Sequence, residues 1–529
     1  MSPTIAGLRI SPVYIAPQPA PVSTESINAV EAVTAIPSTT VSLGQSPNSN
    51  EDARLYTSRG TLGASQVRYA LEQDNLDKLS ISLISSIQSS SIGARFQGIG
   101  AALLEQLAAN GGQSVSQSVF TFTEGTQPSA EALKLQGNGL RENPTNAVSL
   151  TLTSASGATV TLSLASNEKG LAVSAQVEGG QLTDNELKGL AALADSFQGA
   201  INGLTEDPPR LDLGNLVKLD PSLFSSLQMS AQLETASGEP QRFNLSLNDS
   251  ARTLSLQGPS GNVQLNLDTR DKTLLGNDAQ RQAAIQNYLT QFDTAQRRGK
   301  GDENLTNLFK AAFVQLNSAD DGSKTSTERT SVLGKNDRVL LSGLADFSAS
   351  ISQEVKQVNP MRLSETDYFD YKVSQSTTAR GTAEAARSVQ QDQQASLKAA
   401  YHASLNPEVA LALGTDNASQ NYRYHEINDQ SSSSTRLAYD KKDRLIEATA
   451  TQQASQNERV RTFINGAVEA DVSTPTSVSE SRNLLGLLND AFTQERASLR
   501  DRGVSILEAQ LASKRSEWGL QSNTSEIRG

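Results

Sequence analysis

The stretch that decides the fold is residues 147–204, which read AVSLTLTSASGATVTLSLASNEKGLAVSAQVEGGQLTDNELKGLAALADSFQGAINGL. Its first half holds three runs in which apolar residues alternate with polar ones, and the apolar members are Leu150 and Leu152, then Val160, Leu162 and Leu164, then Leu171 and Val173. A period of two with Thr and Val predicts half-buried strands. Ser156-Gly157 and residues 167–170 supply turns, so we expect an antiparallel meander.

The second half of this stretch has the period of a helix. Thr183 can accept a hydrogen bond from the free backbone amides of a helix start, and Glu186 can reach back, which is a capping box. Leu182 and Leu187 stand where a hydrophobic staple would pack. One apolar stripe follows at helical spacing: Leu187, Leu190, Leu193, Phe197, Ile201 and Leu204. The strands and the helix can bury each other, which predicts an α+β fold class.

The pattern returns after Asp207-Pro208-Pro209. Apolar alternation recurs at Met229, Ala231 and Leu233, at Phe243, Leu245 and Leu247, at Leu254 and Leu256, and at Val263, Leu265 and Leu267. Leu162, Leu164, Leu171 and Val173 correspond to Leu245, Leu247, Leu254 and Leu256 at one constant offset. Asn277 and Gln280 then open a second helix. An internal duplication is one interpretation, and the alternative is that two Leu/Ser meanders simply look alike.

The chain as a whole predicts antiparallel meanders, each packed by an amphipathic helix, with flanking helical segments. We expect a disordered leader over 1–64, a helical segment over 65–112, an α+β domain over 113–318, a linker over 319–345, a second β-rich α+β region over 346–475, C-terminal helices over 476–518 and a tail over 519–529. Smaller expectations are a loop over 124–146 with room for one helical turn, a polar Ala/Gln helix over 382–405 that ends before Pro407, and three short strands over Tyr422–Ile427, Arg436–Tyr439 and Arg444–Thr449.

The leader is distinguished by its composition. Residues 1–50 carry seven prolines and only three charged residues, Arg9, Glu25 and Glu31. Low charge and frequent Pro predict disorder. Pro12 and Pro17 interrupt any apolar run of signal-peptide length, so a classical secretion signal is not expected. The Ser/Thr/Pro-rich composition resembles the export signals of type III and flagellar substrates, and ordinary disordered tails share it.

The totals exclude several classes of function. Hydrophobic content of 36% and aromatic content of 5% are low for 529 residues, so we expect several modest cores. The net charge of −12 argues against nucleic acid as a partner, because Arg297, Arg298 and Lys300 form only a short basic cluster. The absence of cysteine excludes disulfides, thiolate metal sites and cysteine nucleophiles.

One segment resembles a calcium-binding loop. Residues 317–328 place Asp321, Gly322 and Glu328 at the fifth, sixth and twelfth positions of such a loop. Asn317 replaces the usual first Asp, Ala319 supplies no oxygen, and Lys324 stands where an apolar residue is usual. With these departures, a polar linker is the preferred interpretation, and no metal ligand is assigned.

Other motifs carry no chemistry either. Gly98-Ile99-Gly100 lacks the third glycine of a dinucleotide-binding loop, since Leu103 occupies that position, and no phosphate-binding loop or Gly-x-Ser-x-Gly elbow occurs. We therefore expect no nucleotide. His402 and His425 are the only histidines; a solvent-facing or hydrogen-bonded side chain is the preferred interpretation of each. We assign no catalytic and no cofactor-binding residue.

Tyr439-Asp440 followed by Arg444-Leu445 resembles a single YD-type β-hairpin repeat, which occurs in long bacterial surface proteins. The resemblance covers about ten residues. The glycine that usually precedes the Arg is Asp443 here, and no function is transferred.

These features favour a non-enzymatic, exported or envelope-associated bacterial interaction protein with a protein partner. One alternative is a hydrolase-like enzyme whose site is built from scattered Asp, Glu, Ser and Tyr residues. Another is a cytoplasmic regulatory protein. Neither a transmembrane segment nor a cofactor is expected.

Overall fold

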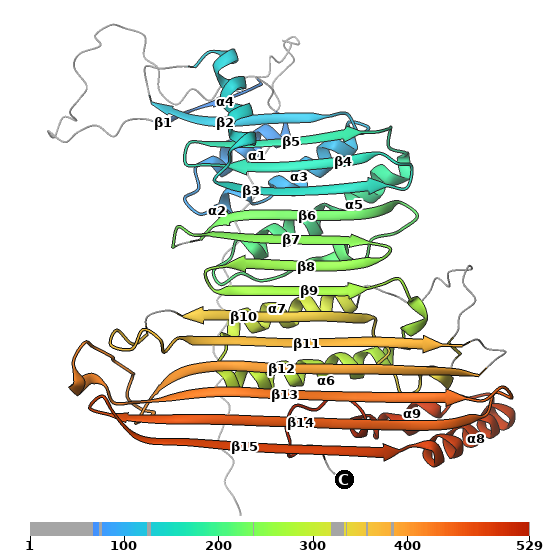
Figure 1. Cartoon of the computed structure of the whole chain (residues 1–529). Helices are drawn as coiled ribbons and strands as arrows, with labels where there is room; N and C mark the ends of the chain where they lie inside the picture. The colour runs from blue at the N-terminus through green and yellow to red at the C-terminus, as the bar shows by residue number, and fades with distance from the viewer. Residues whose placement is uncertain are drawn as a thin grey trace, which may run out of the picture. The chain divides into compact units, whose positions relative to one another are not determined.

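A single antiparallel sheet organises the chain (Figure 1). The computed structural model describes residues 67–73, 77–123, 128–235, 237–318, 333–334, 336–355, 358–381 and 386–527; the expected leader lies outside them. In the described residues the strands are β1 Val67–Leu71, β2 Val115–Thr123, β3 Asn146–Ser154, β4 Thr159–Ser166, β5 Gly170–Glu178, β6 Phe224–Glu234, β7 Pro240–Asn248, β8 Ala251–Gly258, β9 Gly261–Asp268, β10 Asp346–Val355, β11 Asp367–Arg380, β12 Arg387–Ser404, β13 Tyr422–Tyr439, β14 Leu445–Ile464 and β15 Ala467–Asn483. Their order in the sheet is β1-β2-β5-β4-β3-β6-β7-β8-β9-β10-β11-β12-β13-β14-β15.

Helices cover one face of this sheet. They are α1 Lys78–Ile87, α2 Ile92–Phe96, α3 Ile99–Ala109, α4 Ala130–Glu142, α5 Asp184–Leu204, α6 Asp278–Gly299, α7 Glu303–Asn317, α8 Leu485–Arg502 and α9 Leu507–Ala512. Figure 1 shows α4 alone in front of the sheet, beside β2 and β5, and the other helices behind it. The α+β fold class is therefore confirmed. Beyond α4, the described helices leave the front face of the sheet open.

The α+β unit at residues 147–204 forms as its sequence predicts. The backbone N–H of Glu186 donates to Thr183 Oγ1 at 3.3 Å, and the N–H of Thr183 donates to Glu186 Oε2 at 2.7 Å, which completes the capping box. Phe197 of α5 is fully buried. Gly100 of α3 lies so close to α5 that a Cβ there would stand 2.8 Å from Ile201 Cδ1. Gly100 therefore serves helix packing, whereas Gly98 adopts φ 73° at the N-cap of α3.

The second meander and its helix also form. Asn277 accepts from the backbone N–H of Gln280 at 2.9 Å and caps α6. The pairs Leu150–Leu162 and Leu164–Val173 recur as Ala231–Phe243 and Leu245–Leu254, each residue shifted by 81 positions (231 against 150). The sequence match between Leu162 and Leu245 has an offset of 83 positions (245 against 162). It therefore differs by two residues from the offset of 81 that the strand pairing gives. The duplication itself stays a prediction.

Two expectations in the N-terminal part are wrong in part. The expected helical segment over 65–112 does contain α1, α2 and α3, but it begins with a strand, β1, whose Tyr69 and Leu71 pack against the core. The expected loop over 124–146 contains the helix α4, which Ser129 caps by accepting from the N–H of Ala132. Two glycines in a polar segment concealed this helix. A Cβ at Gly137 would stand 2.8 Å from Ser118 Oγ, so the glycine permits close packing.

The C-terminal strands are longer than the sequence suggested. The expected Ala/Gln helix over 382–405 is the strand β12, which buries alternate residues: Gln391, Gln393, Ala395, Leu397 and Ala399. Ala and Gln favour helices in isolation, but pairing with β11 and β13 overrides that preference. The three short strands expected after Tyr422 are two long ones, β13 and β14. The C-terminal helices start at Leu485, because β15 extends to Asn483.

One main hydrophobic core joins the two parts that the sequence separated, and four smaller hydrophobic clusters accompany it, so the expectation of modest cores is wrong for the largest of them. β9 pairs directly with β10, so the sheet continues across the expected linker. Tyr288 and Phe292 of α6 and Phe313 of α7 contact Phe347 of β10 and Tyr371 of β11. The expected tail also packs on the sheet, where the N–H of Leu520 donates to Gln393 Oε1 at 2.9 Å.

Candidate functional site

The front face of the sheet is the candidate site, and strand alternation defines it. In β10, Phe347, Ala349 and Ile351 point into the helix-covered core, so Ser348 and Ser350 point to the front. The cross-strand pairs carry this alternation from strand to strand. Two rows of front-facing residues result, and they run across the strands.

Row A and row B are defined by the hydrogen-bond register. Row A is Gln176, Thr161, Thr151, Gln228, Ser246, Thr253, Asn266, Ser348, Ser374, Gln394, Ser432, Gln453 and Ser479. Row B is Ser116, Ser174, Ser163, Ser149, Ser230, Asn244, Ser255, Gln264, Ser350, Lys372, Ser396, Gln430, Ser455 and Ser477. Every member except Lys372 is Ser, Thr, Asn or Gln, so the two rows form an almost uncharged strip.

Charged side chains on this face stand beside the strip. Asp370 and Lys398 lie two residues beyond row B on β11 and β12, and Asp392 lies two residues beyond row A on β12. Lys372, the charged member of the rows, has its Nζ 2.9 Å from Asp370 Oδ2, so an acidic neighbour partly neutralises it. The centre of the front face is therefore nearly neutral, and the charged side chains lie beside it.

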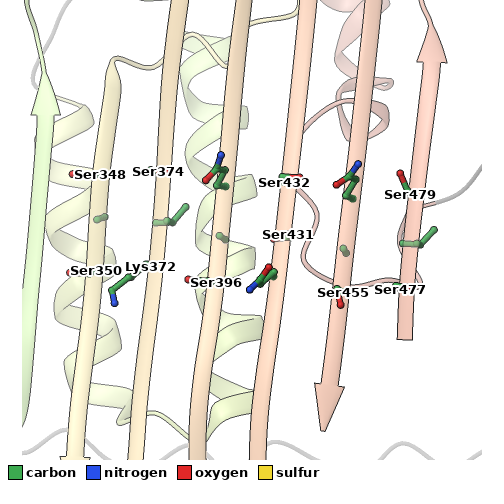
Figure 2. Close-up of a pocket in the computed structure, with 18 of the residues that line it drawn as sticks. Ser348, Ser350, Lys372, Ser374, Ser396, Ser431, Ser432, Ser455, Ser477 and Ser479 are labelled. Carbon is green, nitrogen blue, oxygen red and sulfur yellow. The ribbon is translucent and has the colours of Figure 1, made fainter. Parts of the chain in front are cut away.

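A broad hollow of about 870 Å³ lies over the strip between β9 and β15 (Figure 2). Figure 2 shows serines from neighbouring strands lining it, among them Ser374, Ser432 and Ser479. Small serine side chains alternate with longer amides: β12 carries Gln394 in row A and Ser396 in row B, and β13 reverses that order. The hollow falls in the size range of ligand-binding clefts in proteins.

The polar side chains of the two rows are free for a ligand in the hollow. From β9 to β15, and within the described part of the chain, no row side chain other than Lys372 hydrogen-bonds to another protein group. Hydroxyls and amides both donate and accept, so they can bind a neutral polar molecule. Apart from Lys372, these row positions carry no acidic, basic or imidazole side chain. The arrangement suits binding rather than acid/base chemistry.

His402 lies in a buried network at one end of the front face. His402 lies on the strand β12, where the sequence predicts a helix. Its side chain is fully buried. Nδ1 lies 2.5 Å from Asp367 Oδ1 and Nε2 lies 3.3 Å from Glu365 Oε2, while the Tyr422 hydroxyl donates to Glu365 Oε2 at 2.6 Å. Burial lowers the pKa of His402, but hydrogen bonds that the imidazole donates to Asp367 and Glu365 outweigh burial and raise this pKa above 6.5.

This network fastens two loops to the sheet. Asn359 and Glu365 belong to the loop before β11, and Gln420 belongs to the loop before β13. The Asn359 amide donates to Gln420 Oε1 at 2.8 Å and to the Tyr422 hydroxyl at 3.0 Å. Because the imidazole of His402 is inaccessible, the network has a structural role. The preferred interpretation of His402 as a hydrogen-bonded residue therefore holds.

His425 is a second hydrogen-bonded histidine and lies apart from His402. Its Nδ1 lies 2.8 Å from Glu458 Oε1, and its ring stacks on Tyr401 with 4.6 Å between ring centroids. Arg298, from the short basic cluster, also approaches Glu458 and forms an ion pair with Asp429. Within the basic cluster, Arg298 therefore holds α6 to the sheet.

Two other sequence motifs have structural explanations. Asn317 ends α7, and its amide donates to the carbonyl of Phe313 at 2.8 Å; positions 319–328 of the calcium-type loop lie outside the described residues. Tyr439 to Leu445 form the hairpin between β13 and β14, as the YD resemblance suggests. Asp443 adopts φ 58° there, the left-handed region that explains a glycine at this position in YD repeats.

Comparison with protein-family models, curated proteins and solved structures found no match. None of the helices that the described residues form combines the length and apolar character needed to cross a membrane. Among those same residues, no cluster of three or more His, Asp or Glu side chains is placed to hold a metal ion.

The sequence analysis does not identify the two rows, although the polar residues that form them are visible in the sequence. Ser, Thr, Asn and Gln at alternate strand positions are visible in the sequence, but which strands are neighbours is not. Residues of one row come from segments as distant as Ser116 and Ser477. Only the strand order turns separate polar positions into a continuous strip.

Proposed function

We propose that this protein is a non-enzymatic interaction protein that binds a macromolecular partner on the strip formed by rows A and B. The observation that carries the proposal is the uncharged strip with free hydroxyls and amides, opposite a face that the helices cover. A strip that extends over so many strands can bind an extended partner at many positions at once.

The hydrolase-like alternative receives less support from the same face. A general acid and a general base need titratable groups held within reach of one substrate. The hollow is lined by Ser, Gln, Asn, Ala and Val residues and by Lys372, which pairs with Asp370. His402, which carries a perturbed pKa, is fully buried and away from the hollow.

The charge of the face supports the expectation that nucleic acid and nucleotides are not the partner. Binding of phosphates requires concentrated Lys or Arg residues. The strip offers Lys372 alone, and the whole chain has a net charge of −12. A protein partner was the expectation from sequence, and it remains one outcome of the tests below.

Export to the bacterial envelope forms the second part of the proposal. It rests on the composition of residues 1–64 and on the absence of cysteine. Deletion of the first 60 residues should leave the protein in the cytoplasm, as cell fractionation would detect. Retention of both the full-length and the truncated protein in the cytoplasm would favour the cytoplasmic regulator, and export of both would contradict a signal in the first 60 residues.

The binding part of the proposal can be tested by placing a photo-crosslinking amino acid at Ser432 in row A and, as a control, at Thr290 on the exposed side of α6. Irradiation of producing cells should give a discrete higher-mass adduct from position 432 and not from position 290. Identical adducts from both positions, or none from 432 and further row positions, would contradict the use of this face.

A further inference from the structure

The chemistry of the strip narrows the class of partner. Hot spots in protein–protein interfaces are rich in Trp, Tyr and Arg, and interfaces are depleted in Ser. Rows A and B contain no aromatic residue and no Arg, and Ser is their commonest member. A membrane surface would need apolar or basic residues, which the rows also lack. A second copy of the same face would bring two hollows together and leave space unfilled.

A neutral polymer that carries many hydroxyl or amide groups does match the strip. Neighbouring strands lie roughly 4.8 Å apart, so each row repeats hydrogen-bonding groups at that interval. Residues two apart on a strand are separated by roughly 6.7 Å, which sets the spacing between the rows. A chain that lies along the strip could therefore contact row A on one side and row B on the other.

We propose that the strip binds a linear, uncharged glycan that lies across strands β9–β15, along the hollow and between rows A and B. This inference rests on the proposed function and departs from the expected protein partner. Amides such as Gln394, Gln430 and Gln453 pair with sugar hydroxyls, and the small serines leave room for the rings.

Two properties of the binding follow from this geometry. Because no aromatic side chain stacks on a sugar ring in the rows, each sugar contributes little, and affinity depends on the number of sugars bound. The affinity should rise with glycan length until the chain spans the hollow, which is roughly 29 Å over seven strands. Because both surfaces are nearly uncharged, salt should hardly change the affinity.

The test uses the full-length protein and isothermal titration with neutral β-1,4-linked oligosaccharides of increasing length, both glucose and N-acetylglucosamine series. Ser432→Glu places a charge in the centre of the hollow, whereas Gln286→Glu adds the same charge on the exposed side of α6. We expect Ser432→Glu to weaken binding by about tenfold or more, since a charge loses water without gaining a partner. Gln286→Glu should bind like the wild type.

Other outcomes overturn the inference in distinguishable ways. Absence of binding by all neutral oligosaccharides, with a protein adduct from position 432 in cells, would reject the glycan and leave the proposed function intact. If the oligosaccharides do not bind and position 432 gives no adduct, both the glycan inference and the proposed function are rejected. Equal loss in the two Glu variants, or binding confined to anionic polysaccharides and abolished by salt, would also reject the glycan strip. Circular dichroism melting of each variant separates a lost site from a lost fold.

Discussion

At the scale of single residues, Glu186 does more than its capping box requires. Its carboxylate accepts from Thr183 and also from the backbone N–H and the hydroxyl of Ser156, at 3.0 and 3.1 Å, so it ties the helix α5 to the turn between β3 and β4. Burial raises the pKa of Glu186, but hydrogen bonds from Thr183 and Ser156 outweigh burial and lower the pKa to about 2.

The pH dependence of stability tests this role. A carboxyl with a depressed folded-state pKa stabilises the fold above its ordinary value of 4.5, and this contribution is lost as pH falls toward about 2. Wild type should therefore exceed Glu186→Gln in free energy of unfolding at pH 5, and the difference should shrink toward pH 2. Urea unfolding at several pH values measures it. A difference that does not vary with pH would refute the assignment.

His402 predicts a pH dependence of opposite sign. A histidine with a raised folded-state pKa stabilises the fold fully below its ordinary value of 6.5, and the contribution is lost as pH rises through the raised pKa. The free energy of unfolding of wild type should approach that of His402→Gln as pH rises above 6.5. Urea midpoints of both proteins provide the measurement. A growing advantage of wild type at alkaline pH would contradict the charged network with Asp367 and Glu365.

At the scale of elements, the packing of α5 on the sheet is the most local test. Phe197 is fully buried, so Phe197→Ala should cost about 3–5 kcal/mol, the sum of lost transfer energy and a cavity. Thr183→Ala should cost about 1 kcal/mol through the lost cap. Asn185→Ala, exposed on the opposite side of the helix, should be nearly silent. Urea unfolding ranks the three, and a harmless Phe197→Ala would show that α5 does not pack as described.

Helices and strands can be predicted from the sequence where the capping residues and the apolar pattern indicate the same element. The capping box of α5, the Asn277 N-cap of α6 and the apolar stripes of both helices are local signals, and both helices form where expected. The sequence predicts a helix in place of β12, because Ala and Gln favour helices. The strand forms because it pairs with β11 and β13. α4 was missed because Gly137 and Gly139, which weaken a helix in isolation, are tolerated in its packing.

At the scale of the whole molecule, the sheet joins regions that looked like separate domains. β9 and β10 pair along seven residue pairs, from Asp346–Asp268 to Ser352–Asn262, and α6 packs on strands beyond them. Cleavage at a protease site introduced between residues 319 and 332 should therefore leave the two fragments associated. Size-exclusion chromatography in native buffer should show co-elution. Separate elution without denaturant would mean that each part is an independent domain.

The candidate site belongs to this largest scale, and for that reason the sequence did not reveal it. The Ser/Gln/Thr-rich composition pointed to binding rather than catalysis, but not to a place. Ser432 and Gln453 become neighbours through a ladder between β13 and β14, and Ser350 joins them only through β11 and β12. A site made from one or two side chains per strand has no local motif.

The central claim is that helices cover one face of the sheet while the other presents accessible, uncharged rows. The chain has no cysteine, so single-cysteine variants report each position separately. Ser432→Cys and Gln453→Cys, in row A, should react rapidly with a maleimide in the native protein. Ser431→Cys and Ala454→Cys, their buried neighbours at 8% and 3% exposure, should be protected until the protein unfolds. Equal reactivity at adjacent positions would contradict the two-faced sheet on which the proposed function rests.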